Sequence, residues 1–263
     1  MVTFLSSLTY TRIEQMIIAA AKLLEDRKIV FVGTGMPLLA ALLAKVTHAP
    51  NLVLLFEAGG IDPQRGPTLP ISVGDSMTTW KAIMAASMDY VMSLAQAGYI
   101  EYGMLGAAQI DKYGNINTTV IGSWEEPKVR LPGSGGANDI ASLCWRTIII
   151  MKQDKTRFVE KLDFRTSPGY LSGPGARERV GLPRGTGPWR VVTQLGIYGF
   201  DEKDKQLTLL AIYPGVTIEE IQANSSFPIK IPDKVEVLPE PSLEELKVLR
   251  NLDPYGLVLS KSK

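Results

Sequence analysis

One carboxylate of the sequence occupies a position that favours a reactive role. The stretch NLVLLFEAGGIDP, residues 51–63, places Glu57 directly after an apolar run and just before a pair of glycines. The apolar run predicts a buried strand, so Glu57 lies where a core strand ends, beside a turn with little side-chain bulk. Charged groups are rarely buried without a partner. This carboxylate therefore needs a cation, a hydrogen-bond network or a chemical role.

Two glycine-containing loops are candidates to bring backbone amides to a reacting group. The first is GTGMPL, residues 33–38, and its candidate site residues are Gly33, Thr34 and Gly35. The second lies in LPGSGGANDIAS, residues 131–142, before a predicted helix, and its candidates are Gly133, Ser134, Gly135, Gly136, Ala137 and Asn138. Glycine lets the backbone approach a ligand closely, and N–H groups at the start of a helix favour negative charge.

Both loops also have other interpretations. The first is similar to a dinucleotide fingerprint, in which an acidic residue about 20 positions on binds the ribose. Leu38 replaces the third glycine and Pro37 removes an amide, which disfavours an NAD site. The second loop lacks the lysine of a triphosphate-binding loop. It could also be only a tight turn capped by Asn138 or Asp139.

One carboxylate and two amide-rich loops together suit acyl transfer. A carboxylate can attack a thioester carbonyl to form an acyl anhydride, and loop amides can hold the oxyanion that develops. Because carboxylates are ionised at neutral pH, this chemistry needs no serine, cysteine or histidine as nucleophile or base.

The surrounding pattern predicts the elements that position these residues. Thr11 and Glu14 form a capping box for a helix over residues 11–26. Residues 28–37 predict a buried strand with a glycine turn, residues 37–46 a helix, and residues 51–57 the strand that ends at Glu57. This order is a βαβ unit, which requires a parallel sheet with helices on its faces.

Further elements follow along the chain. We expect a helix over 75–98, extended chain over 100–111 and 118–123, a β-hairpin over 191–214, and helices over 217–225 and 242–251. The glycine- and proline-rich segment 166–188 is too long for a casual linker, which favours a functional loop or one packed against a partner. Its charged residues Arg177, Glu178 and Arg179 indicate either a solvated loop or a contact surface.

Composition excludes several classes of function. The 263 residues carry 28 Lys and Arg against 27 Asp and Glu, so a net charge of +1 gives no basic field for nucleic acid or an anionic membrane. The first 15 residues predict no secretory leader, and no run reaches the roughly 20 apolar residues of a membrane span. We expect an intracellular, cytoplasmic protein with one domain over 1–263.

The remaining reactive side chains do not predict a second chemistry. The one histidine, His48, cannot build a zinc site that needs two, and a lone histidine is more often a packed or surface residue. The one cysteine, Cys144, lies in the apolar stretch IASLCWRTIII and is expected to be buried and structural. We expect no metal and no permanently bound cofactor.

The longer motifs resemble the B subunits of family I coenzyme A transferases, in particular the glutaconate type. The resemblance covers almost the whole chain and depends on VGTGMPLLAALLAKVTHAP, FEAGG, GAAQIDKYGNINTTVIG, GSGGANDIAS and KLDFRTSPGYLSGPGARERVGLP. It implies the open, largely parallel α/β sheet of these transferases, flanked by helices, with a β-hairpin and short helices in the C-terminal third. It also implies coenzyme A, as acyl-CoA, for a substrate and a homologous A subunit for a partner.

The resemblance further implies that Glu57 is the nucleophile, which carries the acyl group and then CoA, and that the loop of residues 133–137 covers the reacting thioester. The acceptor would be a glutaconate-like dicarboxylate or another short-chain acid. Ala58 and Asp139 depart from the family pattern and predict altered substrate choice. Two alternatives stay open: a ring-opening CoA-ester hydrolase, against which Glu57 argues, and a non-catalytic subunit whose partner holds the active site.

Overall fold

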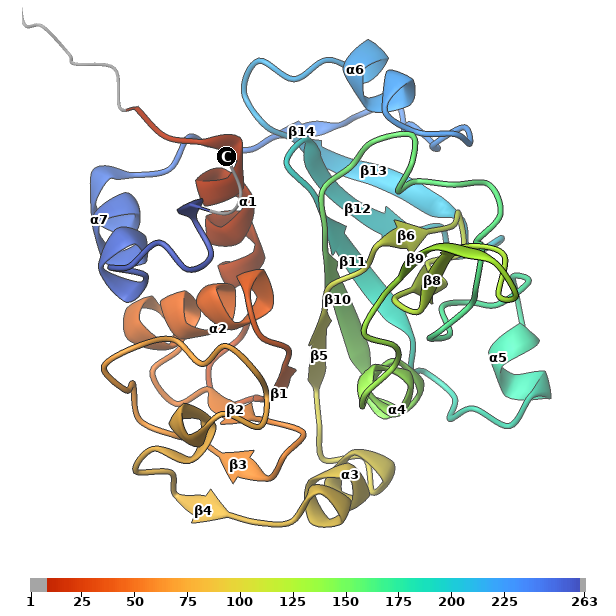
Figure 1. The fold of residues 1–263 in the computed structure, drawn as a ribbon. Helices are drawn as coiled ribbons and strands as arrows, with labels where there is room; N and C mark the ends of the chain where they lie inside the picture. The colour runs from red at the N-terminus through yellow and green to blue at the C-terminus, as the bar shows by residue number, and fades with distance from the viewer. Residues whose placement is uncertain (1–8, 261–263) are drawn as a thin grey trace, which may run out of the picture.

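Residues 9–260 are described by the computed structural model, and their main feature is one mixed sheet of ten strands (Figure 1). The five central strands are mutually parallel, and antiparallel strands flank them on both sides. In spatial order the strands are β14 (Glu236–Val237), β13 (Leu207–Ile212), β12 (Gly196–Phe200), β11 (Pro188–Val192), β10 (Arg146–Ile150), β5 (Tyr102–Leu105), β1 (Ile29–Val32), β2 (Val53–Leu55), β3 (Gly60–Ile61) and β4 (Met84–Ala85). This confirms the predicted largely parallel α/β sheet.

Three helices pack together on one face of the sheet: α1 (Arg12–Ala21), α2 (Met36–Thr47) and α7 (Leu243–Leu252) (Figure 1). The predicted capping box of α1 is present, because the Thr11 side chain accepts from the Glu14 amide while the Glu14 carboxylate accepts from the Thr11 amide. Pro37 lies in the first turn of α2, where a missing N–H is tolerated. These helices bury the apolar faces of the central strands.

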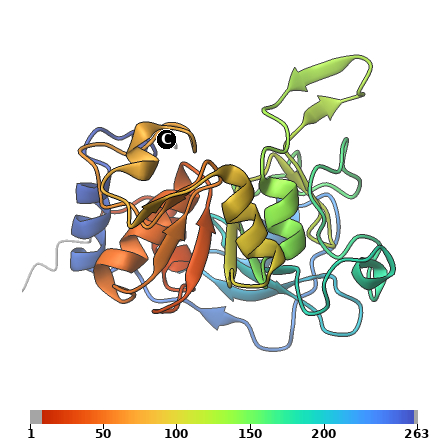
Figure 2. The ribbon, with the colours of Figure 1, turned by 90° about the horizontal axis from the view of Figure 1, so that it is seen from below.

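The opposite face is covered by α3 (Met88–Gln96) and α4 (Ala137–Leu143), which lie side by side (Figure 2). Beside them are two short ribbons, β6 (Gln109–Ile110) with β7 (Ile116–Asn117), and β8 (Val120–Gly122) with β9 (Pro127–Arg130). The β8–β9 ribbon projects away from the rest of the molecule in Figure 2. None of the helices within residues 9–260 is long and apolar enough to cross a bilayer. The predicted absence of a leader concerns the first 15 residues, of which 1–8 lie outside the described range.

The prediction of one helix over 75–98 is wrong for its first half. The chain instead forms the 3-10 helix η1 (Ser76–Thr79) and strand β4 before α3 begins. Lys81 has a φ of +46°, in the left-handed region, which interrupts any helix there. Pairing of β4 with β3 then fixes an extended conformation, so a tertiary contact overrides the local helical pattern.

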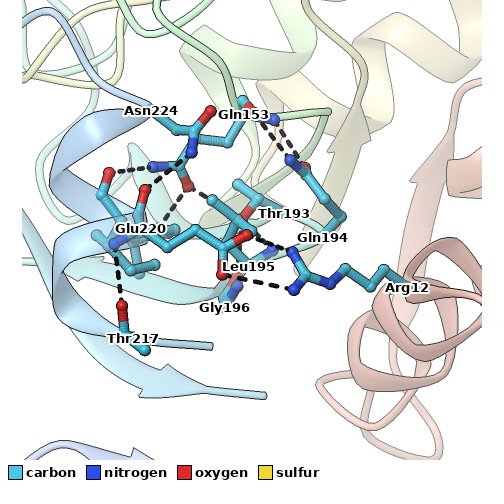
Figure 3. A network of polar contacts seen from close by, with 11 residues as sticks. Arg12, Gln153, Thr193, Gln194, Leu195, Gly196, Thr217, Glu220 and Asn224 are labelled. Atoms are coloured by element: carbon cyan, nitrogen blue, oxygen red, sulfur yellow. Dashed lines mark hydrogen bonds and ion pairs between the residues drawn. The ribbon is translucent and has the colours of Figure 1, made fainter. Parts of the chain in front are cut away.

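The C-terminal third matches its prediction. β12 and β13 form the expected hairpin around a charged turn, although the first residues of the predicted range, 191–192, belong to β11, which pairs antiparallel with β12. The short helix α6 (Ile218–Ala223) is anchored by a polar network at this end of the sheet (Figure 3). Gln153 donates from Nε2 to the Ile221 carbonyl, and Arg12 of α1 forms a 2.5 Å ion pair with Glu220.

Candidate active site

A cleft opens where the parallel strands end. The strand order changes direction between β1 and β5, because β2 follows β1 on one side and β5, β10 and β11 lie on the other. Ligands of open α/β sheets bind at such a switch point, outside the carboxyl ends of the strands. The cleft encloses about 420 Å³, and its walls come from the ends of these strands and from the second glycine loop: Val32, Gly33, Thr34, Glu57, Val73, Leu105, Gly106, Ala107, Ala108, Thr118, Leu131, Pro132, Gly133, Ser134, Gly135, Ala137 and Ile140.

Glu57 lies in the cleft wall, two residues beyond the end of β2. It occupies the tight turn between β2 and β3, in which the Phe56 amide donates to the Gly60 carbonyl at 2.9 Å. Phe56 is buried and Glu57 is half-buried. The expected carboxylate at a strand end, partly removed from water and open to approach, is therefore found in the structure.

The two glycines after Glu57 have a packing role that the sequence did not reveal. A Cβ at Gly59 would lie 2.0 Å from the Ala86 carbonyl oxygen, and one at Gly60 would lie 1.9 Å from that of Thr78. Only glycine permits the backbone next to β4 and the backbone of η1 to approach this turn so closely. The glycines thus fix the turn that holds Glu57.

The hairpin of β2 and β3 is also held by an ion pair from α2. Lys45 Nζ lies 2.7 Å from Asp62 Oδ1 and donates to the Leu52 carbonyl at 2.5 Å. Both side chains are largely buried, with 23% and 15% of their surface exposed. The pair joins the end of α2 to both strands that flank Glu57.

The second glycine loop reaches Glu57 directly. The Gly136 amide donates a 3.0 Å hydrogen bond to Glu57 Oε2. A Cβ at Gly136 would lie 2.8 Å from the same oxygen and 2.5 Å from Met92 Cε, while one at Gly135 would lie 3.2 Å from Glu57 Oε1. The absence of side chains at these positions lets the loop lie against the carboxylate.

Most amides of the two loops already have partners, which limits those that can serve an oxyanion. The Gly33 amide donates to the Met104 carbonyl at 3.2 Å, and the Gly133 amide donates to the Thr118 carbonyl at 2.9 Å. Gly136 serves Glu57, and Ala137 donates to the Ser134 carbonyl. Within the described part of the chain, the amides of Thr34 and Gly35 in the first loop and of Ser134 and Gly135 in the second have no hydrogen-bond partner.

The other predicted site residues differ in whether they line the cleft. Thr34 lies in the cleft, and Gly35, with a φ of +79°, lines its extension toward the start of α2. Asn138 does not line the cleft; its Nδ2 donates to the Thr166 carbonyl at 2.8 Å, so its side chain secures α4. Asp139 is exposed in the first turn of α4.

Sequence reasoning missed the wall formed after β5. Leu105 ends β5, and residues 106–108 follow it as residues 33–34 follow β1, so the predicted parallel order was the signal that could have found them. Thr118 was missed too, and its Oγ1 donates to the Gly133 carbonyl at 2.8 Å. Val73 comes from a segment of irregular chain, for which no periodic pattern exists.

The cleft is uncharged apart from Glu57. Among the described residues that line it and its extension, none is Arg, Lys or His. His48 lies at the far end of α2, where its Nε2 is 3.0 Å from the Leu24 carbonyl oxygen. Cys144 is buried behind α4, and burial raises the pKa of its thiol to about 12. Glu57 is therefore the single ionisable side chain of the site.

Comparison with known proteins identifies relatives of this chain. Residues 13–224 match the family model described as coenzyme A transferase. The chain is 40% identical over 246 residues to the B subunit of 3-oxoadipate CoA-transferase from Pseudomonas knackmussii, covering 93% of this chain and 94% of the relative. It is 39% identical over 252 residues to the B subunit of glutaconate CoA-transferase from Acidaminococcus fermentans, covering 93% of each.

A solved structure has the same fold. The crystal structure of glutaconate coenzyme A-transferase from Acidaminococcus fermentans superposes with a TM-score of 0.89 at 37% identity, covering 95% of this chain and 98% of the other. The cholesterol ring-cleaving hydrolase IpdB subunit of Rhodococcus jostii is more distant, at 26% identity over 230 residues, which is 84% of this chain and 83% of the relative.

Proposed function

The chain belongs to the coenzyme A transferase family, and from this premise we propose that it is a catalytic subunit that moves CoA from an acyl-CoA to a free carboxylic acid through Glu57. The observation that carries the proposal is the position of Glu57, the single charged group in a cleft at the carboxyl edge of the sheet. Its neighbour is a loop whose unpartnered amides can stabilise an oxyanion.

The proposed reaction is ping-pong. The Glu57 carboxylate attacks the thioester carbonyl, the C–S bond breaks, and CoA leaves as the thiolate, giving a mixed anhydride. The thiolate then attacks the glutamyl carbonyl and releases the first acid, so that CoA is bound to Glu57 as a thioester. The second acid reverses both steps, which regenerates the Glu57 carboxylate and forms the new acyl-CoA.

The loop of residues 133–137 would assist both attacks. In the resting site the Gly136 amide binds one carboxylate oxygen, which fixes the direction of the other. The amides of Ser134 and Gly135 would take the oxyanion, since they have no partner and belong to the loop that contacts Glu57. Removing one such donor typically costs about 3 kcal/mol of transition-state stabilisation.

The second substrate is proposed to be a dicarboxylic acid. Glutaconate and 3-oxoadipate, after which the two transferase relatives are named, both carry two carboxylates. The described cleft lining offers no cation for a second carboxylate or for the phosphates of CoA, which Arg or Lys usually bind. Both relatives are named as the B subunits of their enzymes, and we propose that a homologous A subunit supplies these cations.

The decisive experiment is chemical trapping. The chain is purified with its A subunit and incubated with acyl-CoA alone, and borohydride is added to reduce any glutamyl thioester. We expect loss of activity and a reduced side chain at Glu57, identified by mass spectrometry of the peptide. Glu57→Gln, which keeps the size but not the nucleophile, should neither transfer CoA nor be modified.

Two alternatives predict different outcomes. A ring-opening hydrolase would consume its CoA ester without any acceptor acid and without a trapped thioester, and the lower identity to IpdB disfavours it. A non-catalytic subunit would leave transfer intact in Glu57→Gln, with the label on the partner. Full activity of the isolated chain would contradict the need for an A subunit.

A further inference from the structure

The long loop 166–188 contacts both ends of α4 and buries one charged side chain in the protein interior. Arg177 lies in the short helix α5 (Ala176–Arg179) and is 2% exposed, whereas Glu178 and Arg179 on the same helix are exposed. The loop is thus packed within its own chain, which neither sequence interpretation of these charged residues anticipated, and Arg177 marks where it packs.

Arg177 is held by oxygen acceptors from two segments. Its Nη2 donates to the Ala141 and Ser142 carbonyls, at 3.1 and 3.0 Å, in the last turn of α4. Its Nη1 donates to the Gly169 carbonyl at 2.9 Å and to that of Pro168 at 3.3 Å. The guanidinium therefore ties the C-terminal end of α4 to the start of the loop.

This arrangement requires arginine. A planar guanidinium presents its donors as a rigid fork and can serve separate pairs of carbonyls at once, whereas an ammonium is a compact point charge. None of the described carboxylates forms an ion pair with Arg177, so its charge is balanced by carbonyl dipoles. The C-terminal end of a helix is also where a cation is stabilised.

The same loop holds the other end of α4. Asn138 Nδ2 donates to the Thr166 carbonyl at 2.8 Å, and Thr166 Oγ1 accepts from the Thr118 amide at 2.9 Å in the cleft wall. Gly136, whose amide donates to the Glu57 carboxylate, directly precedes α4. With seven residues, α4 spans about 10 Å, so a shift at its last turn moves its first turn.

On the basis of the proposed function, we propose that Arg177 is a positioning residue for CoA transfer: it fixes α4 so that the loop of residues 133–137 meets Glu57 in reacting geometry. Arg177 touches neither substrate nor Glu57 and acts through the helix. Tolerances in such sites are small, because a displacement of 1 Å can cost on the order of a hundredfold in rate.

The test uses the complex of this chain with its A subunit and three variants. Arg177→Met removes the donors with little change in length, and Arg177→Lys keeps the charge but not the fork. Thr186→Val removes one Nη2 acceptor at 2.8 Å together with the contacts of this hydroxyl with the Ser142 and Pro183 carbonyls. Arg179→Met is the matched control, because Arg179 is exposed on the same helix and makes one 3.4 Å contact with the Pro174 carbonyl. Kinetics are measured well below each variant's melting temperature.

For Arg177→Met we expect kcat to fall roughly a hundredfold while KM for both substrates changes less than about threefold. Arg177→Lys should recover part of this loss, Thr186→Val should show a smaller one, and Arg179→Met should match the parent. Amide hydrogen exchange over residues 134–143 should quicken in the order of the kcat losses. If Arg177→Met does not fold, kcat and amide hydrogen exchange of Thr186→Val and Arg177→Lys test the proposal in its place.

A merely structural role would lower the melting temperature and leave kcat and exchange at 134–143 unchanged, and that result overturns the proposal. Failure of the proposed function looks different. In that case the parent complex gives no borohydride-sensitive thioester at Glu57, or Glu57→Gln still transfers CoA, whatever Arg177 does. The exchange measurement tests the effect of Arg177 on α4 independently of any activity.

Discussion

The Gly136 amide donates a hydrogen bond to the Glu57 carboxylate across 79 residues of sequence. The two residues come from different layers of the fold, since Glu57 lies in a turn of the sheet and Gly136 lies directly before a helix packed on its face. The contact engages Oε2, while Oε1 lies beside Gly135 of the same loop. It also explains why position 136 has no room for a side chain.

Gly136→Ala should therefore damage activity far more than folding. Its Cβ would enter the space of Glu57 Oε2 at 2.8 Å and displace the carboxylate or the loop. We expect kcat of the complex to fall on the order of a hundredfold. Gly74→Ala is the control, because a Cβ there meets no atom within 4 Å. Unchanged kcat in Gly136→Ala would contradict the placement of this loop at the reacting centre.

Lys45→Met should loosen the hairpin that holds Glu57. The change leaves the Asp62 carboxylate, 15% exposed, without its cation, and we expect a loss of about 2 kcal/mol in the free energy of unfolding, measured by urea denaturation. Lys22→Met removes the more exposed pair with Glu245 and should cost about 1 kcal/mol or less. Equal losses in the two variants would show that the Lys45 pair has no special role.

Stability should depend on pH through Glu14. Burial alone would raise the pKa of Glu14, but hydrogen bonds from Arg250 and from the Thr11 amide lower it below 4.5. A lowered pKa in the folded state means that the stabilisation is complete above pH 4.5 and is lost as the pH falls through the folded value.

Glu14→Gln, which keeps the capping box, should be less stable than the parent by about 1 kcal/mol at pH 7. The difference should vanish in strong acid, where the parent carboxyl is also neutral. Urea denaturation across this pH range measures it, with the exposed Glu125→Gln as the control. A difference between Glu14→Gln and the parent that stays constant with pH would mean that the Arg250 pair is not its source.

Cys144 should be unreactive in the folded chain. Burial raises the pKa of its thiol to about 12, so roughly one thiol in ten thousand is ionised at pH 8, and the thiolate is the reactive form. Iodoacetamide should label Cys144 within minutes in urea and remain without effect on the native chain, as mass spectrometry would show. Rapid native labelling would indicate local opening behind α4.

Local sequence patterns determined the elements on which the site is built. The capping box of α1, the glycine turn before α2 and the charged turn of the β12–β13 hairpin are each set by neighbours in sequence, so the pattern predicted them. The βαβ order also required a parallel sheet, whose strands end at one edge. Glu57 and the first glycine loop could therefore be expected together from the order of the elements alone, whereas the place of the second loop was implied only by the family resemblance.

The contacts that these residues make with one another were decided only by the tertiary structure. Packing of α4 on the sheet chose Gly136 as the donor to Glu57, and pairing of β4 with β3 turned a helical pattern into a strand. Backbone partners engaged the Gly33 and Gly133 amides but left the amides of residues 34–35 and 134–135 without partners. Burial of Arg177 was missed in sequence, because a buried and a solvated arginine look the same until the carbonyls that surround it are known. Each of these outcomes depends on contacts between distant segments, whose energies no local pattern records.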